Sequence, residues 1–156
     1  MIELKIYSYI AKGDDGSVSI TYSGKPLPSD RNDLIELSDE DIIKYNTHIT
    51  YIDCCSLNGE TLEIDPAKLL VKIRANIVIN INDRCQALRT LVTQAAVLDN
   101  KEVAQEIAST IKTLMLFPKS EIFSSNLTNI DDILNITCPE LSIDHQSLYT
   151  DKLYGI

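Results

Sequence analysis

The sequence predicts an α+β fold with a small N-terminal antiparallel β unit, an antiparallel helical hairpin and an irregular C-terminal tail. Three observations predict it. In residues 1–64 apolar and polar side chains alternate between turn signals, which is typical of half-buried strands. In residues 65–118 apolar side chains recur at three-, four- and seven-residue steps, which is typical of helices. Residues 119–156 show neither period, so we expect three parts with these boundaries: a β-rich head, a helical hairpin and a docking tail.

The head should begin with a strand, because four apolar residues occupy even-numbered positions and would therefore point to one face of a strand. They are Ile2, Leu4, Ile6 and Ile10. The glycine-containing turn at residues 12–17 should return the chain into a second strand from Val18 to Tyr22. Pro26 and Pro28 then end the pairing, because proline cannot donate a ladder hydrogen bond.

A short helix should follow Ser38, which is a favoured N-cap residue. Three acidic residues at 39–41 occupy its first turn, where the helix dipole favours negative charge. Alternation at residues 49–55 indicates another strand, and Asn58-Gly59 is a strong hairpin signal before the return strand at residues 62–64. The head should therefore contain about four strands and one small helix.

The first long helix should begin at Asp65-Pro66, where Asp65 can cap free N–H groups and proline suits the first helical position. Its apolar stripe consists of Leu70, Ile73, Ile77, Ile81, Leu88, Leu91, Ala95 and Leu98. Residues 77–81 are rich in β-branched side chains, so a strand remains an alternative there. The length of the periodic segment favours a helix of roughly thirty residues.

A second helix should be capped by Asp99, with Glu102 completing a capping box. It should end at Phe117-Pro118. The short turn between the helices makes them antiparallel neighbours. Two helices alone leave one side of their apolar stripes open, so we expect the head or another subunit to cover it.

The tail is polar, with one short capped helix expected near residues 128–134. Its apolar residues are scattered anchors, which include Ile143, Leu148, Leu153, Tyr154 and Ile156. We expect the tail to dock, either on its own chain or on a neighbour. Deletion of residues 140–156 should then abolish assembly and leave the rest folded.

Charge is unevenly distributed along the chain. Residues 1–65 carry five basic and thirteen acidic residues, residues 66–118 carry seven and four, and residues 119–156 carry two and six. The acidic head and tail would repel a phosphate backbone, so we predict no nucleic-acid partner. No apolar run approaches the roughly twenty residues that span a bilayer, so we predict no membrane partner.

The sequence predicts no catalytic residue, no cofactor, no metal site and no enzyme activity. The four cysteines at 54, 55, 85 and 138 match no zinc or redox spacing, which favours buried free thiols in a reducing compartment. Cys55 with His48 is a conceivable nucleophilic pair, and a pocket with a shifted pKa at either residue or at Cys54 would favour an enzyme. The alternative to such a pair is buried thiols and a surface imidazole.

Basic residues lie mainly on the expected helices. Arg84 is close to the apolar stripe and should pair with an acid of the head or tail. A solvated helical face explains most of these charges. The alternative is head-to-tail assembly, in which an acidic end of one protomer meets the basic helices of the next.

The order of parts resembles small tail and tail-fibre accessory proteins of tailed bacteriophages, including tail-fibre assembly proteins. The similarity lies in the short N-terminal unit that begins Met1-Ile2-Glu3-Leu4, the helical segment that opens at Asp65-Pro66, and the run Arg84-Cys85-Gln86-Ala87-Leu88-Arg89. That segment ends Leu114-Met115-Leu116-Phe117-Pro118. The family usually has a Trp near this end, which this chain lacks, and the tail falls outside the pattern. The resemblance implies a virion component or assembly factor and assigns no site residues.

We therefore expect a non-enzymatic phage structural or accessory protein, a tail or tail-fibre adaptor that forms homo- or hetero-oligomers with other virion proteins. The alternatives are an acidic anti-defence or inhibitor protein that binds a host enzyme, and a tail-fibre assembly chaperone. The chain has no secretory signal peptide, so we expect it in the virion or the host cytoplasm. The predicted interface residues are Arg84, Arg89, Leu148, Leu153 and Tyr154.

Overall fold

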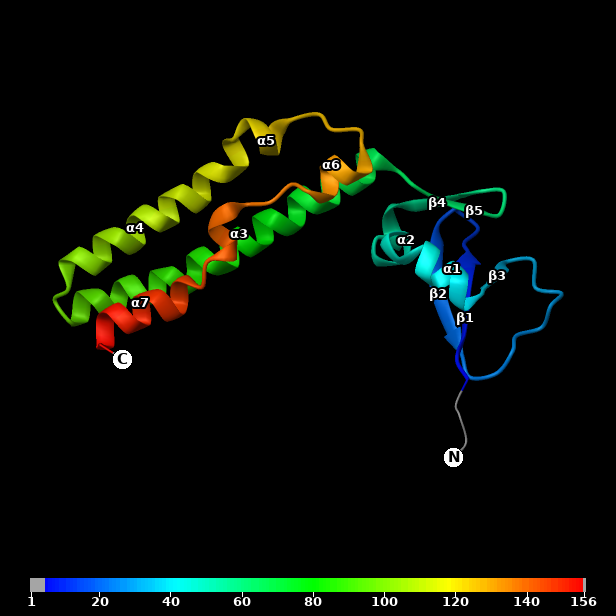
Figure 1. The fold of residues 1–156 in the computed structure, drawn as a ribbon, viewed down its shortest axis with the longest axis horizontal. Coiled ribbons are helices and arrows are strands. Elements are labelled where there is room, and N and C mark those ends of the chain that lie inside the picture. Colours follow the sequence, from blue (N-terminus) through cyan, green and yellow to red (C-terminus); the bar gives the residue numbers. More distant parts are fainter. Residues whose placement is uncertain (1–4, 156) are drawn as a thin grey trace. The chain divides into compact units, whose positions relative to one another are not determined.

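The computed structural model describes residues 5–155, and Figure 1 shows their fold. Antiparallel strands at the N-terminal end are followed by helices, which confirms the predicted α+β class. The chain divides into two compact units, Met1–Leu69 and Leu70–Ile156. The first contains all the strands of the described residues, and the second consists of helices.

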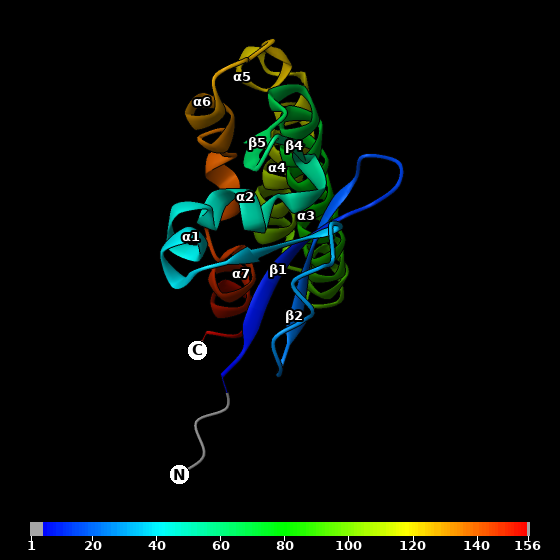
Figure 2. The same cartoon turned by 90° about the vertical axis from the view of Figure 1, so that its right-hand side faces the viewer.

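Three antiparallel strands form the sheet of the first unit in the order β2-β1-β3, with β1 and β2 side by side in Figure 2. Ile10 at the centre of β1 is opposite Ile20 and Ile35 on the two flanking strands. The strands are β1 (Tyr7–Lys12), β2 (Val18–Ser23) and β3 (Leu34–Leu37).

The first strand differs from the predicted one-sided pattern. Ile2 and Leu4 lie outside the described residues. Ile6 precedes β1 and is 66% exposed, so its predicted inward position is wrong. Tyr9 and Ile10 are both buried although successive strand residues point to opposite faces. The Tyr9 hydroxyl accepts a hydrogen bond from the backbone N–H of Leu27 at 3.0 Å, so the segment after β2 helps to cover the second face.

The second hairpin confirms the Asn58-Gly59 signal. It is formed by β4 (Cys55–Asn58) and β5 (Thr61–Ile64), and Asn58 is opposite Thr61. The loop is therefore Gly59-Glu60, and Gly59 has a φ of 64°. Positive φ at the first of two loop residues suits a type II′ turn, where glycine is favoured.

Two short helices and a 3-10 turn connect the two sets of strands: α1 (Asp39–Lys44), α2 (Asn46–Thr50) and η1 (Ile52–Cys54). The predicted Ser38 cap is confirmed, since the Asp41 N–H donates to Ser38 Oγ at 3.1 Å and the Ser38 N–H donates to Asp41 Oδ2 at 3.0 Å. The strand predicted at residues 49–55 is wrong except for Cys55. Ile49 and Tyr51 alternate with polar residues, but a segment this short also fits helical turns.

Two long helices form the hairpin of the second unit: α3 (Pro66–Val97) and α4 (Lys101–Leu116). Residues 77–81 are helical, so the strand alternative is excluded. Asp65 caps α3 as predicted, with Oδ1 accepting from the Ala67 N–H at 2.9 Å. The cap of α4 is Asn100, whose Oδ1 accepts from the Val103 N–H at 3.2 Å. The predicted Asp99 cap is wrong by one residue, because Asp99 makes the turn itself with a φ of 50°.

Residues 119–155, here called the C-terminal arm, return along the hairpin in Figure 1. Arg74 donates to the carbonyl oxygen of Ser125 and Arg84 to that of Leu141, so the arm runs in the direction of α3. The predicted irregular tail is wrong in this respect, because much of the arm is helical. Its elements are α5 (Glu121–Ser124), α6 (Ile130–Leu134), η3 (Pro139–Ser142) and α7 (His145–Tyr154).

The core of the second unit is formed by buried side chains of α3, α4 and the C-terminal arm. The buried residues of the hairpin are Leu70, Ile73, Ile77, Ile81, Cys85, Leu88, Leu91, Ala95, Val103, Ile107 and Leu114. Those of the arm are Phe123, Ile133, Ile136, Cys138, His145 and Tyr149. The chain therefore covers the open side of its own hairpin with the arm. Residues 140–155 contribute His145 and Tyr149 to this core, so their deletion would remove part of the core, and whether the rest stays folded remains a prediction.

Candidate functional site

Arg84 makes contacts inside the second unit. Its guanidinium donates hydrogen bonds to the carbonyl oxygens of Ile143 and of Leu141, the latter at 3.4 Å. Nη1 also lies 3.2 Å from Nδ1 of His145. The side chain thus holds the junction between η3 and α7, and the predicted pairing of Arg84 with a carboxylate is replaced by carbonyl oxygens and an imidazole.

His145 is 2% exposed and therefore buried, although it lies in the polar tail. Its Nε2 lies 3.1 Å from Oε2 of Glu140, and its ring stacks on Tyr149 with 6.2 Å between the centroids. Arg84 can only donate, so a neutral ring accepts at Nδ1 and donates from Nε2 to Glu140. The imidazole is therefore a structural link between α3, η3 and α7.

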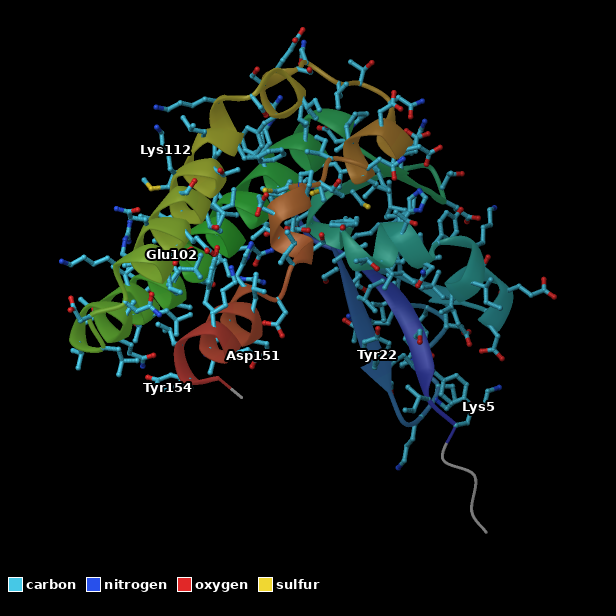
Figure 3. All side chains as sticks on the ribbon, turned by 60° about the vertical axis from the view of Figure 1, so that its left-hand side comes forward. Lys5, Tyr22, Glu102, Lys112, Asp151 and Tyr154 are labelled. Atoms are coloured by element: carbon cyan, nitrogen blue, oxygen red, sulfur yellow. The ribbon has the colours of Figure 1, made fainter. Side chains whose placement is uncertain are left out.

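The other predicted interface residues are at the surface but do not form one patch. Arg89 is exposed on α3, Leu148 and Tyr154 are partly exposed on α7, and Leu153 is half-buried. Tyr154 lies at the end of α7 near Asp151 in Figure 3. Leu148 and Tyr154 are six residues apart, which places them on different sides of the helix at about 100° per residue.

A second stripe on α3, which sequence reasoning missed, faces solvent. This outer stripe consists of Val71, Ala75, Ile79, Asn82, Gln86, Thr93 and Val97, all exposed and uncharged. The exposed Arg89, three residues after Gln86 and four before Thr93, is a charged residue on the same face. Val71, Ile79 and Val97 are 68%, 55% and 81% exposed. The steps of three, four and seven residues keep the set on one face for about 39 Å. The signal was present in the sequence, but the larger inward stripe of the same helix obscured it.

A groove runs between α3 and the arm. Its central hollow has a volume of about 340 Å³, with Thr90, Leu91 and Gln94 on one side and Gln146, Thr150 and Tyr154 on the other. Ala87 connects this hollow to one that contains Asp83 and Leu141. Gln146 and Thr150 connect it to another that contains Asp144 and Asp151. We call these three adjoining hollows the arm groove.

The arm groove is better suited to side chains of a protein partner than to an enclosed metabolite. Small-molecule sites usually have volumes of roughly 300–1,000 Å³ and bury most of the ligand. The central hollow is at the lower end of that range and is open to solvent. Its lining combines the amide and hydroxyl groups of glutamine and threonine side chains with the apolar surface of Ala87, Leu91 and Tyr154. The polar groups can bond to peptide groups or polar side chains.

The conceivable Cys55–His48 pair is not assembled. The Cys55 thiol donates to the backbone carbonyl oxygens of His48 and Tyr51, each at 3.4 Å, and not to the imidazole. Burial raises the pKa of Cys55 to about 11, so the thiol stays protonated at neutral pH and is a poor nucleophile. Burial also lowers the pKa of His48, whose ring packs edge-on against Tyr45. All four cysteines are buried and none forms a disulfide bond among the described residues, as predicted.

Within residues 5–155, no cluster of three or more histidine, cysteine, aspartate or glutamate side chains has an arrangement that could hold a metal ion. In the same part of the chain, every helix is too short or too polar to cross a bilayer. Comparison of the whole chain with protein-family models, with curated proteins and with solved structures gives no match.

Proposed function

We propose that the chain is a non-enzymatic structural or accessory protein of a bacteriophage virion, a tail or tail-fibre adaptor that acts through protein–protein contacts. The observation that carries this proposal is the outer stripe of α3. The bacteriophage assignment rests on the resemblance of the Arg84–Arg89 run and the Leu114–Pro118 end to tail-fibre accessory proteins.

The outer stripe has the composition of a contact surface. The solvent face of a surface helix usually carries charged side chains, as α4 does at Lys101, Glu102 and Lys112. The outer stripe instead offers apolar side chains at both ends. Asn82, Gln86 and Thr93 lie between them and can hydrogen-bond across an interface. A partner subunit that lies along α3 would bury these groups together.

The double substitution Val71→Glu with Ile79→Glu tests this surface. Both side chains are exposed, and glutamate has a better helix propensity than either β-branched residue, so the isolated protein should stay folded. We expect the variant to lose the mass increase that the wild-type protein shows when it is mixed with purified tail particles. Light scattering after size-exclusion chromatography measures this increase in mass.

Ile122→Glu is the matched control, because Ile122 is 63% exposed but lies on α5, away from the outer stripe. This variant should assemble like the wild type. If the double variant assembles as well as Ile122→Glu, or if the wild-type protein remains a monomer with particles present, the proposed function is wrong.

A second candidate is an inhibitor or anti-defence protein that binds a basic host enzyme. Residues 1–69 carry six basic and thirteen acidic residues, a net charge of −7, and Asp39, Glu40 and Asp41 open α1. A complex formed through these charges would weaken steeply with salt, whereas contact through the outer stripe, whose own residues are uncharged, would depend much less on salt. An assembly chaperone, the third possibility, would bind tail-fibre protein but be absent from the finished particle.

A further inference from the structure

We propose that the arm groove binds a short basic segment of the partner protein. This inference rests on the proposed function, since it names the chemistry of the partner. The groove is separate from the outer stripe, so a partner that lies along α3 would extend its segment over the edge of that helix. The groove lies within one unit, between α3 and the arm that packs on it.

The charge of the groove favours a cationic occupant. Three carboxylates line it, from Asp83 on α3 and from Asp144 and Asp151 at α7, against one guanidinium, that of Arg84. The net charge of these four groups is −2. Arg84 directs its donors to backbone carbonyls and His145 of the arm, so they are not free to bind an acidic ligand.

The carboxylates of the groove are accessible to a partner. Asp144 accepts hydrogen bonds from the backbone N–H and hydroxyl of Ser147, and these bonds lower its pKa. Asp83 and Asp151 are exposed, and among the described residues neither side chain is hydrogen-bonded or ion-paired. Their charges therefore face solvent with no internal counter-ion, which suits lysine or arginine side chains of a partner.

The size and lining of the groove favour a short extended segment. From Asn80 to Gln94 it follows α3 for about 21 Å, which is the length of roughly six extended residues. Gln94, Gln146 and Thr150 can bond to the peptide groups of such a segment. Leu91 and Tyr154 supply apolar surface at the central hollow for one aliphatic side chain.

Peptide titration of the full chain, followed by ¹H–¹⁵N NMR, tests the inference. The probes are two six-residue peptides, one of alternating arginine and leucine and one of alternating glutamate and leucine. We expect the basic peptide to shift amide signals of residues 80–94 and 144–154, and the acidic peptide to leave them unchanged. Asp83→Asn with Asp151→Asn should weaken binding of the basic peptide about three- to tenfold, because rim ion pairs contribute modestly.

Asp131→Asn with Asp132→Asn is the matched control, because it removes two exposed charges on α6 outside the groove. It should bind the basic peptide like the wild type. Equal weakening by both double variants, shifts outside the groove, or no shift with the basic peptide would overturn the inference. Assembly with tail particles that survives in Asp83→Asn with Asp151→Asn, while peptide binding fails, would overturn this inference and leave the proposed function standing.

Discussion

The hairpin and the C-terminal arm build the same core by different means. The hairpin buries residues at regular steps, such as Ile73, Ile77 and Ile81, so each helix defines its own apolar face. The arm buries residues at steps of two to ten, among them Phe123, Ile133 and Cys138. The comparison shows that a segment can lack any period of its own and still complete a core, because the surface that receives it selects which side chains are buried.

Polar contacts hold the arm where apolar periodicity is absent. Thr110 Oγ1 on α4 lies 2.7 Å from the hydroxyl of Tyr149, and Lys152 pairs with Glu106, about one turn earlier on the same helix. Together with the bonds from Arg84 to the η3–α7 junction, they fix the position of the arm. The hairpin is held mainly by buried apolar side chains.

The largest expected effect tests whether the arm is an equal part of the core. Leu88 in the hairpin and Ile133 in the arm are both fully buried. Leu88→Ala and Ile133→Ala should each lower the free energy of unfolding by about 2–5 kcal/mol, because each leaves a cavity. Urea denaturation measures both values, with the exposed Val97→Ala as a control that should change stability by less than about 0.5 kcal/mol.

The comparison would fail if Ile133→Ala behaved like Val97→Ala while Leu88→Ala was strongly destabilising. The arm would then be a loosely attached tail. A loss of similar size in both core variants, in a single cooperative transition, would instead show that arm and hairpin unfold together.

The sequence predicted those parts of the fold whose signals are local. Ser38 and Asp65 cap their helices with their own side chains, and Asn58-Gly59 turns a hairpin within a few residues. The cap at Asn100 was missed because Asp99 and Asn100 are both good cap residues. Only the three-dimensional turn decides which one has positive φ.

The arm and its contacts were not predictable from the same signals. Arg84 and His145 are 61 residues apart, and nothing in their spacing indicates that they meet. The sequence predicted Arg84 as an interface residue because it is a basic residue close to the apolar stripe, and Tyr154 because it is an apolar anchor of the tail. Both line the arm groove. The groove itself depends on how the arm packs, which no local pattern shows.

An intermediate effect is expected at the contact that joins arm and hairpin. Arg84→Met keeps most of the length of the side chain but removes its hydrogen bonds to the carbonyl oxygens of Leu141 and Ile143. The Ile143 oxygen keeps the bond from the His145 N–H, whereas that of Leu141 loses the bond from Arg84. We expect a loss of about 1–3 kcal/mol in the free energy of unfolding. Amide hydrogen exchange should accelerate in residues 139–155 more than in α3 or α4.

Arg89→Met is the control for this variant, because Arg89 is exposed on α3 and makes none of the bonds to the arm. It should leave hydrogen exchange in the arm unchanged. Equal acceleration in both variants would mean that the charge of α3, and not the specific bonds of Arg84, holds the arm.

The smallest effects on stability are expected from a matched pair of helix-cap substitutions, one in the hairpin and one in the arm. Asn100 caps α4, where its Oδ1 accepts from Val103 in a partly buried position, and Asn129 caps the five-residue α6, where its Oδ1 accepts from Asp132 at the surface. Asn100→Ala should cost about 1 kcal/mol of stability, whereas Asn129→Ala should cost about 0.5 kcal/mol, near the lower end for such caps. Urea denaturation gives both values, and hydrogen exchange should show that Asn129→Ala loosens α6 without affecting α4. The reverse order would indicate that the short helices of the arm contribute more to its docking than its buried side chains do.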